Sequence, residues 1–115
     1  MNSVNLIGRL VEDAVLETGG RGEPRCAMRV AIPRVGTAGM REPGLVYVEV
    51  VATGLRAADL AQRLVAGMRV GVSGRLELDE WTDPDGVPRS RYEVMADQLE
   101  VLDAPPPGEA AARAA

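Results

Sequence analysis

The chain has 115 residues, of which 46% are hydrophobic and only 3% aromatic, and its 13 basic residues face 17 acidic ones for a net charge of −4. This length is enough for one domain with a hydrophobic core, and because Phe is absent the core has to be aliphatic. The absence of His and Lys excludes His-based catalytic triads, His-containing metal sites and a phosphate-binding loop with lysine, so we expect no enzyme, no cofactor and no metal.

Apolar residues recur at every second position of residues 3–11, a period typical of a strand. Gly8 within it indicates a bulge or a close backbone approach. Residues 14–18 are compatible with a continuation of this strand after a bend. Both faces of the first strand carry apolar groups, which predicts that it is covered on both sides.

A second alternating strand runs from Cys26 to Ile32 and is expected to end at Pro33, whose missing N–H cannot pair in a central ladder. Residues 35–44, with several Gly and Pro, are expected to form a mobile loop. Cys26 has no second cysteine as a partner, so we expect a small buried hydrophobe and a reducing, cytoplasmic location. No apolar run reaches membrane-spanning length.

Residues 45–53 predict a third strand, and residues 56–66 predict a helix with an i, i+4 apolar stripe that ends at Gly67. Two more strands are expected over residues 68–82 and 87–102. Three strands, one helix and two strands match the all-β OB-fold, a five-stranded Greek-key barrel with one helix between strands three and four. A small sandwich is the competing architecture.

The sequence therefore predicts an OB-fold domain over residues 1–102 and a short Pro/Ala-rich tail over residues 103–115. Three consecutive prolines followed by small residues cannot extend a sheet, so the tail is expected to be disordered.

The hairpin between the last two strands carries Trp81, the only tryptophan, beside an Asp85-Gly86 turn. Trp81 alternates with the apolar stripe of its strand and shares a face with charged residues, as Tyr47 does on the third strand. Exposed rings of this kind can stack on unpaired bases, which points to single-stranded nucleic acid; packing of the rings on the protein itself is the alternative. Tyr92 falls on the same strand face as Val94 and is expected to pack in the core or at its rim.

The candidate phosphate contacts are arginines, which pair with phosphate through two N–H groups and suit this task better than lysine. A solvated surface arginine is the alternative for each of them. The net negative charge counts against a nucleic-acid partner, but the local field over the binding face decides. The candidates are Arg29, Arg34, Arg75, Arg89 and Arg91.

Four carboxylates near the hairpin could in principle hold a divalent cation, but their spacing fits no calcium loop, and solvated turn residues are the simpler interpretation. They are Asp79, Glu80, Asp83 and Asp85.

Four segments, in order and with fitting spacings, resemble the bacterial single-stranded DNA-binding proteins over about residues 1–102. They are Asn2-Ser3-Val4-Asn5-Leu6-Ile7-Gly8-Arg9-Leu10, Met28-Arg29-Val30-Ala31-Ile32-Pro33-Arg34, Val50-Val51-Ala52-Thr53-Gly54-Leu55-Arg56-Ala57-Ala58-Asp59 with Leu64-Val65-Ala66-Gly67, and Gly74-Arg75-Leu76 through Trp81-Thr82-Asp83-Pro84-Asp85-Gly86.

The resemblance implies an OB-fold that binds unpaired DNA without sequence preference in replication, recombination and repair. It implies a homo-oligomer, with a tetramer expected and a dimer as the alternative. Trp81 matches a base-stacking tryptophan of the family, and Tyr47 matches a position that is often aromatic.

The sequence departs from the family pattern in ways that predict a divergent or accessory member. Thr53 stands where the family often has an aromatic, residues 25–45 contain none, and acidic residues occupy a strand that is usually basic. The acidic, Phe-ending tip that recruits replication and repair enzymes is absent from the sequence, which ends Ala112-Arg113-Ala114-Ala115, so recruitment by that route is not expected. A protein-interaction subunit similar to primosomal replication protein N is the competing function.

Overall fold

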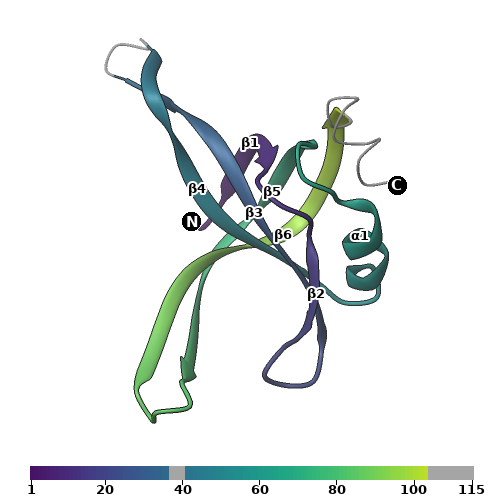
Figure 1. Cartoon of the computed structure of the whole chain (residues 1–115), viewed down its shortest axis with the longest axis vertical. Coiled ribbons are helices and arrows are strands. Elements are labelled where there is room, and N and C mark those ends of the chain that lie inside the picture. The colour runs from purple at the N-terminus through teal and green to yellow at the C-terminus, as the bar shows by residue number, and fades with distance from the viewer. Residues whose placement is uncertain (37–40, 104–115) are drawn as a thin grey trace.

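The computed structural model describes residues 1–36 and 41–103, with the side chains of 41–43 left undescribed. Within these residues one sheet is formed by six strands, and a single short helix packs beside it (Figure 1). The elements are β1 (Val4–Leu10), β2 (Val15–Thr18), β3 (Pro24–Val35), β4 (Arg41–Thr53), α1 (Ala57–Arg63), β5 (Arg69–Thr82) and β6 (Pro88–Asp103).

Five of the strands close into a barrel. The antiparallel ladder runs β1–β5–β6 on one side and β4–β3–β1 on the other, and β4 meets β6 in parallel at Val50↔Val94 and Val51↔Met95. β2 pairs with β3 alongside β1, so β1 and β2 are the two halves of one bent first strand, as residues 14–18 suggested. This arrangement confirms the predicted OB-fold.

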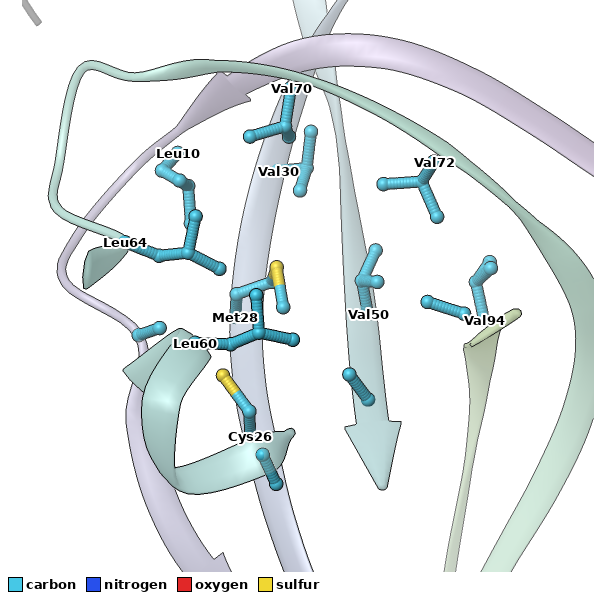
Figure 2. Packing of buried hydrophobic residues seen from close by; sticks show 14 residues of the cluster. Leu10, Cys26, Met28, Val30, Val50, Leu60, Leu64, Val70, Val72 and Val94 are labelled. Carbon is cyan, nitrogen blue, oxygen red and sulfur yellow. The ribbon is translucent and has the colours of Figure 1, made fainter. Parts of the chain in front are cut away.

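Period-two alternation places one face of each barrel strand in the core. Figure 2 shows how side chains from β3, β4, β5 and β6 meet there, with Val30, Val50 and Val70 fully buried. Leu60 and Leu64 come from the helical segment and pack over Cys26 and Met28 at one end of the barrel. Cys26 is fully buried, as expected, and burial raises the pKa of its thiol.

Gly8 lies where β1 meets β3, and a Cβ atom there would collide with the carbonyl oxygen of Ala31 and come within 2.8 Å of Val30 Cγ1. The close backbone approach predicted at this glycine is confirmed. It allows β1 to lie close to β3 on one side while β1 stays paired with β5 on the other.

Two boundaries differ from the sequence-based expectation. β3 continues through Pro33 to Val35, because β1 pairs with β3 only at Val30 and Ala31, which leaves one edge of β3 open where a residue without an N–H is tolerated. Residues 41–44 belong to β4 rather than to a loop, and residues 37–40 of the expected loop lie outside the described residues.

The helix is shorter than its apolar stripe suggested and ends at Arg63. Leu64 is already extended, and its carbonyl oxygen accepts a hydrogen bond from the Ala14 amide at 3.0 Å. Gly67 adopts a positive φ of 88°, but in a turn after the helix, where its amide donates to the carbonyl oxygen of Leu10 at 2.9 Å. Tertiary hydrogen bonds therefore replace the last expected turn of helix.

Two hairpins project beyond the barrel as arms, β3–β4 and β5–β6, and point in different directions away from α1 (Figure 1). On the β5–β6 arm, Leu76 and Leu78 keep the alternation of the buried Val70 and Val72 but are about half exposed. Tyr92 lies opposite Leu78 and is 68% exposed, so the expectation that it packs in the core or at its rim is wrong. Strand alternation correctly placed Tyr92 on the face that continues from the core. At this height the arm extends beyond the barrel, so no other strand of the described residues covers that face.

No helix among the described residues is long and apolar enough to cross a membrane. The expected Pro/Ala-rich tail lies outside the described residues apart from Asp103, which ends β6.

Candidate functional site

The side chains of β3 to β6 that alternate with the core residues form one outer surface, called here the arginine–aromatic face. Each member is positioned by strand register and lies partly in solvent. The face comprises Arg29, Tyr47, Glu49, Arg75, Glu77, Trp81, Arg89 and Arg91.

Tyr47 on β4 forms a cluster with Arg29 of the neighbouring strand. Arg29 pairs in register with Glu49, and Tyr47 stands two residues along β4 on the same face. The guanidinium carbon of Arg29 lies 4.7 Å from the centre of the Tyr47 ring, within cation–π range, and the tyrosine is 50% exposed.

Trp81 forms the equivalent cluster near the tip of the β5–β6 arm. Asp79 pairs in register with Arg91, and Trp81 stands two residues along β5 on the same face, opposite Arg89. The guanidinium carbon of Arg91 lies 5.5 Å from the centre of the indole, which is 43% exposed. Both clusters thus combine a half-exposed ring with a diagonal arginine.

The arginines of the two clusters converge on a single hollow of about 210 Å³. Because Arg29 and Arg91 both line it, the hollow connects the base of the β3–β4 arm with the β5–β6 arm. Its wall carries more carboxylates than guanidinium groups, and it is lined by Glu12, Asp13, Val15, Glu17, Ala27, Met28, Arg29, Glu49 and Arg91.

Arg75 and Arg89 are held by carboxylates of the surface. Arg75 Nε lies 2.8 Å from Glu77 Oε1, and its Nη1 lies 2.8 Å from Asp97 Oδ1. The hydrogen bond to Glu77 and the charge of Asp97 raise the pKa of Arg75. Arg89 Nε donates to Asp83 Oδ2 at 3.0 Å. Both guanidinium groups are therefore bonded to neighbouring carboxylates on the protein surface.

Asp83 organises the turn that follows Trp81. Its Oδ1 accepts hydrogen bonds from the amides of Val87 and Asp85, both at 2.9 Å. The Val87 amide is the main cause that lowers the pKa of Asp83, with Arg89 and the Asp85 amide adding to it against partial desolvation. Asp79 and Glu80 lie within β5, so of the four hairpin carboxylates only Asp83 is seen to bond to the turn, and no group of metal ligands is found among the described residues.

A buried ion pair lies on the same side of β3 and β6 as the arginine–aromatic face. Arg25 Nη2 donates to both oxygens of Glu93 at 2.9 and 3.0 Å, and the Glu93 side chain is only 2% exposed. Glu93 Oε2 also lies 3.6 Å from Arg91 Nε, which links the pair to the Trp81 cluster. Glu17 approaches Arg25 Nε at 3.5 Å.

Sequence reasoning did not single out this pair or the partner carboxylates Glu49 and Asp97. Nothing local distinguishes Arg25 or Glu93 from exposed charges in alternating strands, because β3 and β6 lie far apart in sequence. The partner of Glu49 depends on register, and Asp97 reaches Arg75 at the irregularity between Ser73 and Gly74.

Six of the seven predicted site residues lie on the arginine–aromatic face. Arg34 is exposed on β3 but lies within the irregularity between Pro33 and Val35, where strand register does not place it on this face. Its Cδ lies 3.3 Å from where a Cβ on Gly44 would stand, so Arg34 extends over the β4 backbone.

Comparison with known proteins gives one family and several relatives. The model of the Single-strand binding protein family matches residues 1–102. Single-stranded DNA-binding proteins of Wolinella succinogenes and Helicobacter hepaticus are 32% and 29% identical, over 89% and 94% of this chain but only 64% and 65% of their own length. Single-stranded DNA-binding protein 1 of Clostridium acetobutylicum is 30% identical over 90% of this chain and 94% of its own.

Proposed function

The chain belongs to the single-strand binding protein family, and from this premise we propose that it binds single-stranded DNA without sequence preference. Bases stack on Trp81 and Tyr47, and arginines contact the phosphates between them. The observation that carries this proposal is the pair of half-exposed rings, each beside an arginine, whose arginines line one hollow.

Stacking suits binding without sequence preference because every base presents a π-face, and each stacked base contributes ~1–3 kcal/mol. Arg29 and Arg91 stand between the two rings, with Arg75 and Arg89 further along the same face. Arg34, further along β3, is a phosphate contact for a DNA strand that continues along the β3–β4 arm. In this proposal the protein is cytoplasmic and has no enzymatic activity. It would serve in DNA replication, recombination and repair.

Titration with oligo(dT) tests the proposal directly, because Trp81 is the only tryptophan. We expect strong quenching of its fluorescence, weakening as salt is added. An unchanged emission at low salt would contradict stacking on the indole.

Trp81→Ala is expected to reduce affinity for labelled oligo(dT), read by anisotropy, by ~1–3 kcal/mol, the contribution of one stacked base. Tyr92→Ala is the matched control, since Tyr92 lies on the same arm, is more exposed and points from the opposite face. Equal losses in the two variants would argue against a specific role for Trp81.

We also propose that the chain assembles as a homo-oligomer, with a tetramer favoured over a dimer. β1 supports this proposal: it pairs with β3 only at Arg9 and Leu10, which leaves one edge of residues 4–8 open, and Ile7 is 51% exposed. Exposed strand edges and apolar side chains are typical places for pairing with another chain.

A second candidate function, a protein-interaction subunit of a replication-restart (primosome) complex, is favoured by the other face of the β5–β6 arm. Leu76, Leu78 and Tyr92 are exposed together there, 45%, 46% and 68%. The titration separates the two candidates, because an interaction subunit would leave Trp81 fluorescence unchanged by oligo(dT) at low salt.

A further inference from the structure

Every arginine on the arginine–aromatic face already lies beside a carboxylate of the same chain. Three of these five ion pairs are exposed on both sides, one joins an exposed arginine to a largely buried carboxylate, and one ends on a fully buried carboxylate. The pairs are Arg29–Glu49 at 3.8 Å, Arg75–Glu77 and Arg75–Asp97 at 2.8 Å, Arg89–Asp83 at 3.0 Å and Arg91–Glu93 at 3.6 Å.

This pairing changes the ionic balance of DNA binding. An unpaired arginine that neutralises a phosphate releases a cation condensed on the DNA, which makes affinity fall with salt. An arginine that leaves a carboxylate to reach a phosphate also exposes that carboxylate, which then attracts a cation from solution. The uptake offsets part of the release, so the net ion exchange for each contact is smaller than for an unpaired arginine.

We propose that these carboxylates are internal competitors of the DNA phosphates, which keep binding weak and make it less salt-dependent than its arginines alone predict. The proposal rests on the proposed function. Exposed ion pairs contribute little to stability, so the exchange of Glu49 for a phosphate on Arg29 is accessible. The carboxylates around the hollow add repulsion to a phosphate that enters it.

Arg91 differs from the other three arginines. Its partner Glu93 keeps both hydrogen bonds to Arg25 when Arg91 moves away, so no buried carboxylate is left unpaired. Arg91 therefore reaches a phosphate at the lowest energetic penalty, directly beside Trp81. A DNA strand then binds first at the Trp81 cluster. Glu49, which competes for Arg29, hinders the strand from extending to Tyr47.

The test compares variants in which a carboxylate is replaced by its uncharged amide, over a salt series, with labelled oligo(dT) and anisotropy as the readout. Glu49→Gln frees Arg29, and the double variant Glu77→Gln/Asp97→Asn frees Arg75. Glu100→Gln is the matched control, because it removes the same charge from a separate hollow beside Asn5 and Ile7.

Four independent arginine contacts would give a slope of log affinity against log salt of about −2.8 on single strands. We expect the natural chain to give a shallower slope than this value. The slope of Glu49→Gln should be steeper than that of the natural chain by up to ~0.7. At low salt Glu49→Gln should bind ~1.5- to 5-fold more tightly, the ratio expected for one exposed ion pair. In the double variant the slope and the affinity at low salt should change in the same direction as in Glu49→Gln. In Glu100→Gln both should change much less.

A slope of about −2.8 or steeper in the natural chain, or equal behaviour of Glu49→Gln and Glu100→Gln, overturns this inference while leaving DNA binding intact. If neither the natural chain nor the freed-arginine variants bind at low salt, the proposed function and the inference both fall.

Discussion

Glu93 is the most buried charged side chain among the described residues, and Arg25 holds it with two hydrogen bonds. A buried carboxylate without its partner is strongly destabilising, because its desolvation is no longer compensated. At the residue scale, this pair therefore stabilises the position of β3 relative to β6, the two strands that supply Arg29 and Arg91 to the arginine–aromatic face.

Arg25→Met should lower the free energy of unfolding by about 3–5 kcal/mol, measured by urea denaturation and circular dichroism. Arg29→Met, which breaks an exposed pair on the same strand, should cost about 1 kcal/mol or less. The double variant Arg25→Met/Glu93→Met should recover much of the loss, since no charge is then buried alone. A loss below about 1 kcal/mol in Arg25→Met would contradict the structural role of the pair.

At the element scale, the turn between β5 and β6 depends on Asp83, whose carboxylate accepts two amide hydrogen bonds and one from Arg89. Because these bonds lower its pKa in the folded state, the unfolded chain binds the proton more tightly. Stability from this group is fully present above the ordinary aspartate pKa of about 3.9 and is lost as pH falls through the folded value.

Urea denaturation at about pH 6 and about pH 3 measures this contribution. The loss of stability on acidification should be smaller in Asp83→Asn than in the natural chain, because the variant keeps an acceptor but does not titrate. Asp85→Asn is the control, since its backbone amide rather than its side chain bonds to Asp83. Identical pH dependence in the natural chain and Asp83→Asn would sink this account.

The strands and their faces could be predicted from sequence because period-two alternation is a local property. It correctly separated Trp81 and Tyr47 from the core, and the barrel followed from the order of the elements. The failures have non-local causes. Pro33 is tolerated because one strand edge is open there, and the helix ends early because the Leu64 carbonyl bonds to Ala14.

The site was predicted less completely than the fold for the same reason. Sequence singled out the rings and arginines by residue type, but which carboxylate meets which arginine depends on register and on the irregularities of β6. Tyr92 shows the limit clearly: alternation gave its face, but only the extent of the barrel showed that this face is uncovered.

At the scale of the whole molecule, the two arms make the chain more extended than its length suggests. Its radius of gyration is 15.3 Å, while a compact domain of this size has about 13 Å. Elution volume would therefore overstate the mass, so the proposed oligomer has to be tested by light scattering.

Light scattering should give two or four times the chain mass of 12.2 kDa for the natural protein. Ile7→Glu should shift this toward one chain, because a charge on the open part of β1 opposes pairing with another copy. Leu16→Glu, an equally exposed apolar position on β2, controls for the charge itself. A natural protein that measures as one chain would exclude the assembly.

The β5–β6 arm has one further consequence, because its outer half packs against no part of the core. Its length is therefore free to change without repacking the barrel. Adding two residues to each strand would keep the indole on its present side and carry it further out, whereas adding one would turn it to the opposite side. Reach along a polynucleotide can thus evolve in steps of residue pairs, independently of the domain that anchors it.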